Sequence, residues 1–266
     1  MIDIKGFKEY LYEEELSENT VETYIQGVKR YAEMYDTISK PNLLSFKKYL
    51  LDNFKPKTIN NRITAILNYC KYKGIPMKLK QVKEPKQTYI DNVITVQQYE
   101  KLTAGLKNDC NFRWYSYITL LSKTGMRISE ALRVTKADIL HGSVTMQAKA
   151  HMRTIYFPKS LIGDIMPYLD SIEDRDVVMM NHKGKPLTSR GVSERLQEFA
   201  KKYDIPKEVM HPHSFRHFFA IEFLKRNNNI SFLADLLGHG SVNITQIYLR
   251  QSQEEQKSAI DKAVDW

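Results

Sequence analysis

Hydrophobic residues recur at helical spacing in four stretches near the start of the chain, separated by short polar breaks. Ser17 is suited to cap the second stretch, Pro41 to open the third and Gly74 to close the fourth. Together they predict a small helical domain over residues 1–76. The predicted helices cover about residues 3–15, 18–35, 41–53 and 57–73.

The stretch "MKLKQVKEPKQTYIDN", residues 77–92, is polar and lacks apolar periodicity. A segment of this kind is typical of an extended linker between domains. Residues 93–266 are therefore expected to form a second domain.

Thr95 can cap a helix over residues 96–105, and the more apolar helix "FRWYSYITLLSK" ends just before Gly125. Alternating apolar and polar residues predict two strands, "SVTMQA" and "MRTIYFP", joined near Lys149. The fold class is thus mainly α, with a small antiparallel sheet in the second domain. Further helices are predicted at about residues 160–169, 189–203 with Ser189 as its cap, 213–226, 231–237, 243–250 and 253–264.

The distribution of charge indicates what kind of partner the chain binds. The chain carries 40 Lys and Arg against 31 Asp and Glu, a net charge of +9. Residues 40–83 hold eleven basic side chains and the single acid Asp52, whereas residues 1–39 hold nine acidic and four basic side chains. Such a basic segment favours a polyanion, with nucleic acid the leading candidate. A solvated face is the alternative for any one lysine, such as Lys47 or Lys71.

The same sequence argues against several other classes. Cys70 and Cys110 lie far apart, so neither a disulfide framework nor a zinc site is supported. No apolar run is long enough for a membrane span, and the N-terminus lacks the hydrophobic segment of a signal peptide. We expect a cytoplasmic protein without a membrane anchor, metal or cofactor.

In "TGMRISEAL", Arg127 falls in the first turn of a predicted helix, where a cation opposes the positive end of the helix dipole. An anion held between the helix end and the guanidinium would remove this conflict. Glu130, three residues further on, could hold the side chain in place. A simple surface pair between Arg127 and Glu130 is the alternative.

In "HPHSFRHFFAIEFL", helical spacing places His213, Arg216 and His217 on one face. The phenylalanines Phe215, Phe218 and Phe219 fall on the other face. Two imidazoles and a guanidinium displayed together could bind phosphate oxygens and exchange protons. For one histidine alone, a structural role would be the simpler interpretation.

Two further residues have simple structural interpretations when each is taken alone. Lys149 lies in the predicted hairpin between Ala148 and Ala150, where a lysine is usually just solvated. Tyr248, nine residues after His239 in "LLGHGSVNITQIYLR", shares helical spacing with hydrophobic neighbours and is explained by core packing.

Taken together, "TGMRISEAL", "HPHSFRHFFA", "LLGHGS" and "TQIYLR" occur in an order and spacing that resemble the tyrosine recombinases, or phage-type integrases. The resemblance covers nearly the whole chain, with residues 1–76 similar to the helical core-binding domain and 93–266 to the catalytic domain. Glu130 matches the family's acidic supporting position. The catalytic set implied by the resemblance is Arg127, Lys149, His213, Arg216, His239 and Tyr248.

The hairpin lysine is the loosest match, because the family often has glycine neighbours where this chain has Ala148 and Ala150. Arg153 is the rival for its role. The chain also begins at once with the core-binding helices, so we expect no additional arm-binding domain.

The chemistry of these residue types agrees with the resemblance. Tyr248 is a poor nucleophile unless cations favour its phenolate or a base takes its proton, and Arg127 and Arg216 suit the first task while His213 suits the second. His239 would add a phosphate contact. Lys149 would protonate the departing 5′ oxygen as general acid. The product would be a 3′-phosphotyrosine and a free 5′ hydroxyl, with no need for ATP or metal.

The resemblance therefore implies a site-specific DNA recombinase that works through a Holliday junction as a homotetramer on two double-stranded DNA sites. Integration, excision, inversion and chromosome-dimer resolution all remain open, as do the target sequence, accessory proteins, and docking of the C-terminal tail in cis or in trans. A type IB topoisomerase and a non-catalytic DNA-binding protein are the alternatives, and the intact motif set argues against the second.

Overall fold

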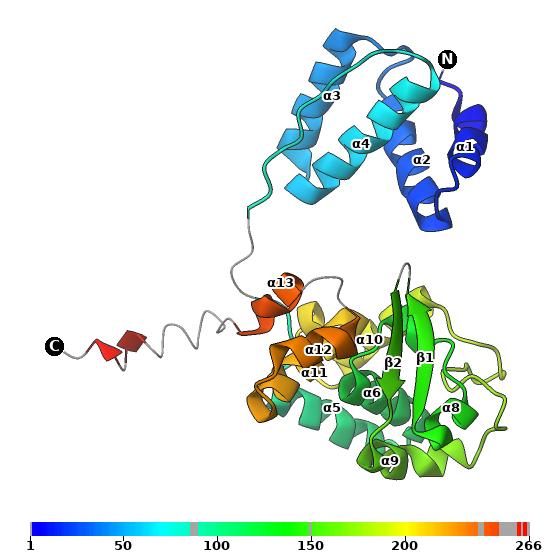
Figure 1. The fold of residues 1–266 in the computed structure, drawn as a ribbon, viewed down its shortest axis with the longest axis vertical. Helices are drawn as coiled ribbons and strands as arrows, with labels where there is room; N and C mark the ends of the chain where they lie inside the picture. The colour runs from blue at the N-terminus through cyan, green and yellow to red at the C-terminus, as the bar shows by residue number, and fades with distance from the viewer. Residues whose placement is uncertain are drawn as a thin grey trace. The chain divides into compact units, whose positions relative to one another are not determined.

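The computed structural model describes residues 2–85, 90–148, 151–238, 242–249, 260–261 and 263–264. By internal contacts the chain divides into two compact units, residues 1–86 and 87–266. Figure 1 labels most of the helices and both strands.

The first unit is formed by helices that enclose a core of aliphatic and aromatic side chains. Ser39 caps the third helix by accepting from the backbone of Asn42, and Pro41 lies in its first turn. Gly74 adopts a left-handed conformation just after the fourth helix, as its place in the sequence predicts. The four predicted helices are confirmed, as α1 (Ile4–Glu13), α2 (Glu18–Ala32), α3 (Lys40–Asn53) and α4 (Pro56–Tyr72).

Part of the predicted linker lies against this core. Met77, Leu79 and Val82 pack on it as an extended segment without helical structure. The side chain of Asn60 fastens the segment by accepting from the backbone N–H of Val82 at 2.8 Å and donating to its carbonyl at 2.9 Å.

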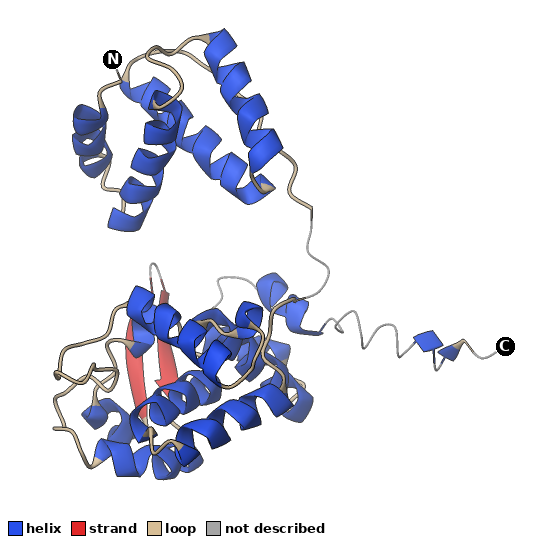
Figure 2. Ribbon diagram, turned by 180° about the vertical axis from the view of Figure 1, so that it is seen from behind, coloured by secondary structure: helices blue, strands red, loops and turns tan. Residues whose placement is uncertain are grey.

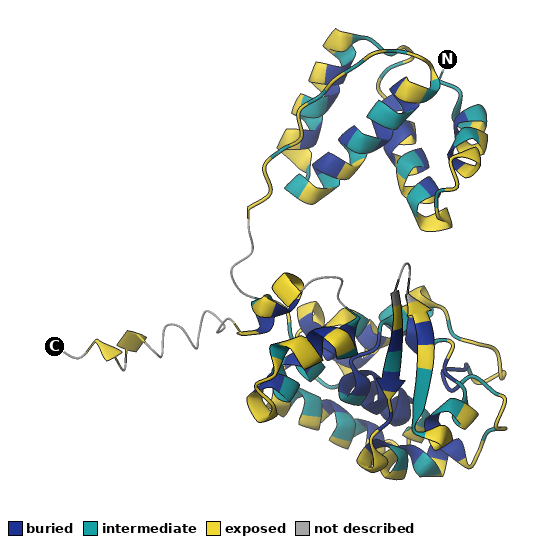
Figure 3. Ribbon diagram, in the orientation of Figure 1, coloured by how far each residue is buried: buried dark blue, intermediate teal, exposed yellow. Residues whose placement is uncertain are grey.

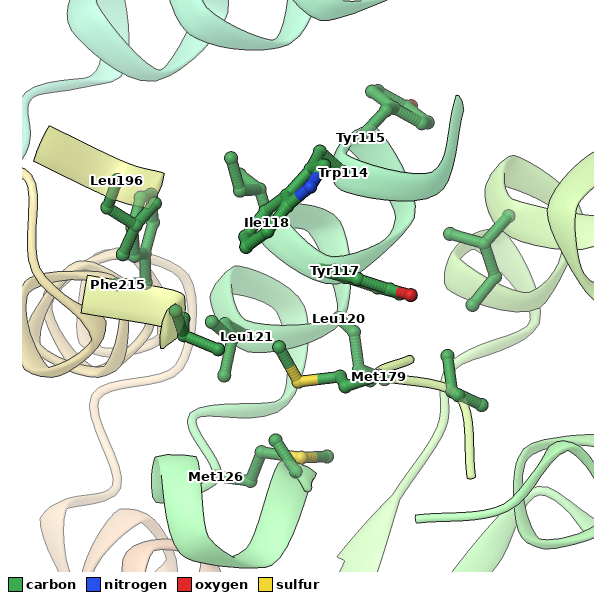
Figure 4. Packing of buried hydrophobic residues seen from close by; sticks show 14 of the residues in the cluster. Trp114, Tyr115, Tyr117, Ile118, Leu120, Leu121, Met126, Met179, Leu196 and Phe215 are labelled. Atoms are coloured by element: carbon green, nitrogen blue, oxygen red, sulfur yellow. The ribbon is translucent and has the colours of Figure 1, made fainter. Parts of the chain in front are cut away.

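The second unit is mainly helical around α6 (Phe112–Thr124), which ends at the left-handed Gly125. Ten of its thirteen residues are buried, and Figure 3 colours the helix accordingly. Figure 4 shows α6 side chains such as Trp114 and Leu121 among residues of other elements, including Leu196 and Phe215. Thr95 caps α5 (Val96–Asn108) with the capping box completed by Gln98.

The predicted hairpin is confirmed as an antiparallel pair of strands, β1 (Ser143–Ala148) and β2 (His151–Tyr156). Ser143 pairs with Tyr156, and the register runs to Ala148 opposite His151. Figure 2 shows this small sheet among the helices of its unit. The mainly α fold class with a two-stranded sheet is thus confirmed.

The helix predicted to hold Arg127 in its first turn is the short α7 (Ile128–Ala131), which begins one residue later. Helix α8 (Lys136–His141) escaped prediction because it is too short to show helical periodicity. The cap of α10 (Ser189–Lys202) is Thr188 and not Ser189, since the Thr188 hydroxyl accepts from the backbone of Gly191.

Further helices of this unit are α9 (Lys159–Leu169), the 3₁₀ helix η1 (Lys207–Val209), α11 (Pro212–Arg226) and α12 (Ile230–Leu237). The predicted helix at 243–250 is divided into α13 (Val242–Thr245) and the 3₁₀ helix η2 (Gln246–Leu249). Most of the helix predicted at 253–264 lies outside the described residues.

Candidate active site

Arg127 lies at the N-cap of α7, one residue before the helix begins. Its backbone N–H donates to Glu130 Oε2 at 2.6 Å, and its Nη1 donates to Glu130 Oε1 at 3.1 Å. The carboxylate of Glu130 therefore supplies the anion that the helix N-terminus and the guanidinium both favour. The pair is not a simple surface pair, because Glu130 is only 1% exposed.

Arg153 binds the same carboxylate from β2. Its Nε and Nη2 donate to Glu130 Oε1 and Oε2 at 3.1 and 2.5 Å, forming a two-pronged pair in which both side chains are 2% exposed. Burial acts to raise the pKa of Glu130, but the N–H of Arg127 and the two guanidiniums outweigh it and hold that pKa below its usual range. Glu130 is thus a buried, ionised link between Arg127 and Arg153.

Three guanidiniums converge on the C-terminal end of α12. Each donates to a different backbone carbonyl, and the carbonyls belong to consecutive residues at the negative end of the helix dipole, where cations are favoured. Arg153 Nη1 donates to the carbonyl of Leu236, Arg216 Nη2 to that of Leu237 at 2.6 Å, and Arg127 Nη2 to that of Gly238 at 3.0 Å.

Arg216 lies on α11 but is 2% exposed, which corrects the expectation that the helix displays it to solvent. Its guanidinium extends into the interior of the unit, where Nη1 donates to the carbonyl of Gly125 at 2.8 Å. Burial, followed by the nearby cations Arg127 and Arg153, lowers the pKa of Arg216 to about 10. The side chain still carries its charge at neutral pH.

The two imidazoles of α11 lie one turn apart and meet edge to face, with ring centroids 4.4 Å apart. His213 is exposed, whereas His217 is half-buried. Partial desolvation of its ring by the surrounding protein and the positive charge of Arg216 lower the pKa of His213. The exposed imidazole is therefore favoured in its neutral form.

Tyr248 lies in η2 and is 8% exposed, among aliphatic side chains of α11 and α12 such as Leu224 and Leu237. Its hydroxyl forms a 2.8 Å hydrogen bond with Nδ1 of His217. Burial raises the pKa of Tyr248, against the opposing effect of Arg216 and then Arg127. The phenol is therefore neutral in this structure and lies within the field of two arginines.

Gly238 ends α12 in the left-handed conformation that its place in the sequence predicts, with φ of +60°. A Cβ at this position would lie 2.5 Å from Cδ of Arg153, so the close approach of the two chain segments also favours glycine. The predicted residues Lys149 and His239 lie outside the described residues.

Two residues of the site were not in the predicted catalytic set. Arg153 alternates with the buried Ile155 of β2 and with the buried Phe157 just beyond the strand, a period of two that is visible in the sequence. His217 shares its face of α11 with His213, but its contact with Tyr248 joins residues 31 positions apart. No local pattern shows such a contact.

Among the residues that the structure describes, no group of three or more His, Cys, Asp or Glu side chains is arranged to hold a metal ion. In the same described ranges, none of the helices has the length and apolar character needed to cross a bilayer.

Comparisons with known proteins bear on the same region. A family model described as the phage integrase family matches residues 92–255. Tyrosine recombinase XerA of Pyrococcus furiosus is 28% identical over 270 aligned positions, which cover 98% of this chain and 93% of the relative. The TnP I resolvase of Bacillus thuringiensis is 24% identical, with 97% of this chain and 98% of that protein covered.

Solved structures share the fold. A lambda integrase tetramer bound to a Holliday junction has a TM-score of 0.72 at 16% identity, covering 94% of this chain and 78% of that chain. The XerH site-specific recombinase bound to its difH substrate has a TM-score of 0.68 at 18% identity, covering 91% of this chain and 78% of that chain. Because the family model spans more than half of the sequence, the chain belongs to the phage integrase family of tyrosine-type site-specific recombinases, enzymes that break and rejoin DNA.

Proposed function

We propose that this recombinase cleaves double-stranded DNA with Tyr248 as its nucleophile and passes through a 3′-phosphotyrosine intermediate. The observation that carries the proposal is that two arginines act on one buried phenol, that of Tyr248. Arg216 and Arg127 both act on Tyr248 electrostatically, and their guanidiniums meet at the end of α12, about ten residues before the tyrosine in the sequence.

In the proposed step, the phenolic oxygen of Tyr248 attacks the phosphorus of a DNA phosphodiester as the bond to the 5′ oxygen breaks. Negative charge grows on the non-bridging oxygens, and Arg127 and Arg216 stabilise it. Arg127 suits this task because its described contacts use only two of five guanidinium N–H groups and its side chain is 35% exposed. His213, the exposed imidazole, and His239 complete the phosphate site.

The 5′ oxygen leaves as a hydroxyl and therefore needs a proton. We assign this proton to Lys149, and the environment of Arg153 supports the choice between the two. Arg153 is buried and committed to Glu130 and to the carbonyl of Leu236, so it lacks the access to a leaving group that a general acid needs. Glu130 acts by holding Arg127 in place.

Joining follows by the reverse reaction with a 5′ hydroxyl from another strand, because the phosphotyrosine ester retains the energy of the cleaved bond. We propose that four copies of the chain act on two DNA sites through a Holliday junction. The likeness to a lambda integrase tetramer bound to a Holliday junction supports this arrangement.

The test is covalent capture on a nicked suicide duplex that carries the enzyme's own site, isolated by selecting bound duplexes from a random library. We expect a protein–DNA adduct that survives denaturation. Tyr248→Phe removes only the nucleophilic oxygen and should abolish the adduct while leaving DNA binding nearly intact.

A persisting adduct would show that another tyrosine attacks. Two other tyrosines serve as matched Tyr→Phe controls. Tyr156 is 56% exposed, and the hydroxyl of Tyr203 donates a hydrogen bond to the carboxylate of Asp109 at 2.5 Å. Strand exchange between two duplex sites then separates a recombinase from a topoisomerase that acts alone.

A further inference from the structure

We infer that His217 is the base that takes the phenol proton of Tyr248 during attack, a role that the sequence favours for His213. The inference rests on the proposed function of Tyr248 as nucleophile. It concerns which imidazole activates the phenol.

The geometry places His217 at the reacting atom. Its Nδ1 lies 2.8 Å from the Tyr248 hydroxyl, within the reach that direct proton transfer requires, and the two rings lie 5.5 Å apart at an interplanar angle of 51°. The ring of His213 contacts the ring of His217 edge to face. Within the histidine pair, His217 is thus the member in contact with the nucleophile.

The environment of Tyr248 creates the need for a base. Its side chain is 8% exposed, and burial raises the pKa of the phenol despite the opposing effect of Arg216 and Arg127. A buried neutral phenol is a weak nucleophile unless its proton is removed as the new bond forms. The two arginines alone do not leave the phenol ionised before DNA binds.

The proton-transfer step balances without a cofactor. Nδ1 of His217 carries a lone pair in the tautomer protonated at Nε2, and it accepts the Tyr248 proton as the bond between the phenolic oxygen and phosphorus forms. The 5′ oxygen departs with its electron pair and takes a separate proton from the general acid. The imidazolium of His217 then lies against the ring of His213. The negative charge developing on the phosphate offsets the positive charges of this imidazolium and of Arg216. In the reverse reaction His217 returns its proton to the tyrosine.

The first experiment separates proton transfer from simple positioning. His217→Asn retains a polar side chain that can accept a hydrogen bond but cannot take up a proton. We expect the rate of covalent cleavage at saturating DNA to fall by roughly 10²- to 10⁴-fold, the range for lost general-base catalysis. DNA affinity and melting temperature should stay close to those of the wild type. His182→Asn makes the same chemical change at an exposed turn and should leave the rate unchanged.

The second experiment lowers the demand for a base. Incorporating a fluorinated tyrosine at position 248 lowers the pKa of the phenol, so the ratio between the cleavage rates of the parent enzyme and the His217→Asn variant should shrink as fluorine atoms are added. A substrate with sulfur in place of the bridging 5′ oxygen relieves only the leaving group. It should leave the His217→Asn deficit in place.

Several results would overturn the inference. One is a cleavage rate of His217→Asn within about 10-fold of the wild-type rate, a loss smaller than the usual range for general-base catalysis. Another is a loss of rate that fluorination of the tyrosine does not reduce. A fluorination-sensitive deficit in His213→Asn alone would assign the base to His213. If His217→Asn fails to fold, His217→Gln is measured in the same way. Failure of the wild type to form an adduct at Tyr248 would instead refute the proposed function, and so the two failures are distinguishable.

Discussion

Replacing Arg153 by alanine tests whether this arginine is a structural link or a general acid. Arg153 joins three elements, because its guanidinium binds Glu130 of α7 through two nitrogens and the carbonyl of Leu236 in α12 through the third. Its side chain is 2% exposed. The structural interpretation predicts a large loss of stability.

The magnitude follows from what remains around Glu130. Breaking a buried ion pair by removing one partner typically destabilises by about 3–5 kcal/mol, because the other charge stays buried. Glu130 keeps its two bonds from Arg127, so we place the loss near the lower limit, about 3 kcal/mol. For a domain of this size, that free energy corresponds to a drop in Tm of roughly 6–12 °C.

The assay is thermal unfolding of the full chain followed by circular dichroism, with the wild type and Lys149→Ala as references. Lys149→Ala, predicted to lie in the hairpin, should change Tm little. A second comparison removes both charges in Glu130→Gln with Arg153→Met. Because an apolar side chain in place of the buried cation leaves no unpaired charge, the double variant should recover much of the lost stability.

A drop in Tm below about 2 °C for Arg153→Ala, corresponding to less than about 1 kcal/mol, would refute the structural interpretation. So would selective rescue of its cleavage rate by a substrate with a bridging 5′ sulfur, because that substrate compensates only for a missing general acid.

Three further predictions concern other parts of the molecule. Lys149→Ala should slow cleavage by roughly 10²- to 10⁴-fold, and the bridging-sulfur substrate should restore cleavage to this variant but not to Arg127→Ala; rescue of neither would remove the lysine from the mechanism. Deleting residues 252–266 should weaken assembly on paired DNA sites more than binding to a single site in gel-shift assays, and equal losses would indicate a tail that packs within its own subunit. Burial lowers the pKa of His211 below its ordinary value of 6.5, and its ring accepts from the N–H of Ser214. The contribution of neutral His211 to the free energy of unfolding should therefore be complete above pH 6.5 and be lost as the pH falls from 6.5 to the lowered pKa. Denaturant titrations at several pH values measure this dependence, and His211→Asn should make it weaker.

The helical part of the fold could be predicted because its elements are long and amphipathic. Runs such as residues 18–32 and 57–72 show the period of 3.6 over several turns, and Gly74 and Gly125 mark helix ends through their left-handed backbone. Elements of one or two turns contain too few residues to show a period. Helix α8 and the 3₁₀ helix η1 were missed for this reason.

The candidate site was predictable where spacing along one helix decides the face. The pairing of Arg127 with Glu130 and the shared face of His213 and His217 both follow from separations of three or four residues. Burial of Arg216 does not, because its partners lie 91 and 21 residues away at the ends of other helices. Such long-range contacts depend on tertiary packing, which the local pattern does not contain.

The meeting of three arginines at the end of α12 explains why this site uses guanidinium groups and not ammonium groups. Arg127 donates to Glu130 through one nitrogen and to Gly238 through another, and a planar fork with five N–H groups can keep such contacts while binding a phosphate oxygen. A lysine ammonium is a single point of charge and would have to share one nitrogen among the same partners. Because the carbonyls that hold Arg127 and Arg216 immediately precede the segment that leads to Tyr248, the groups proposed to bind the phosphate are tied to the same helix end as the nucleophile. The arginines thus combine two tasks, since the contacts that stabilise α12 also orient the cations toward the phenol.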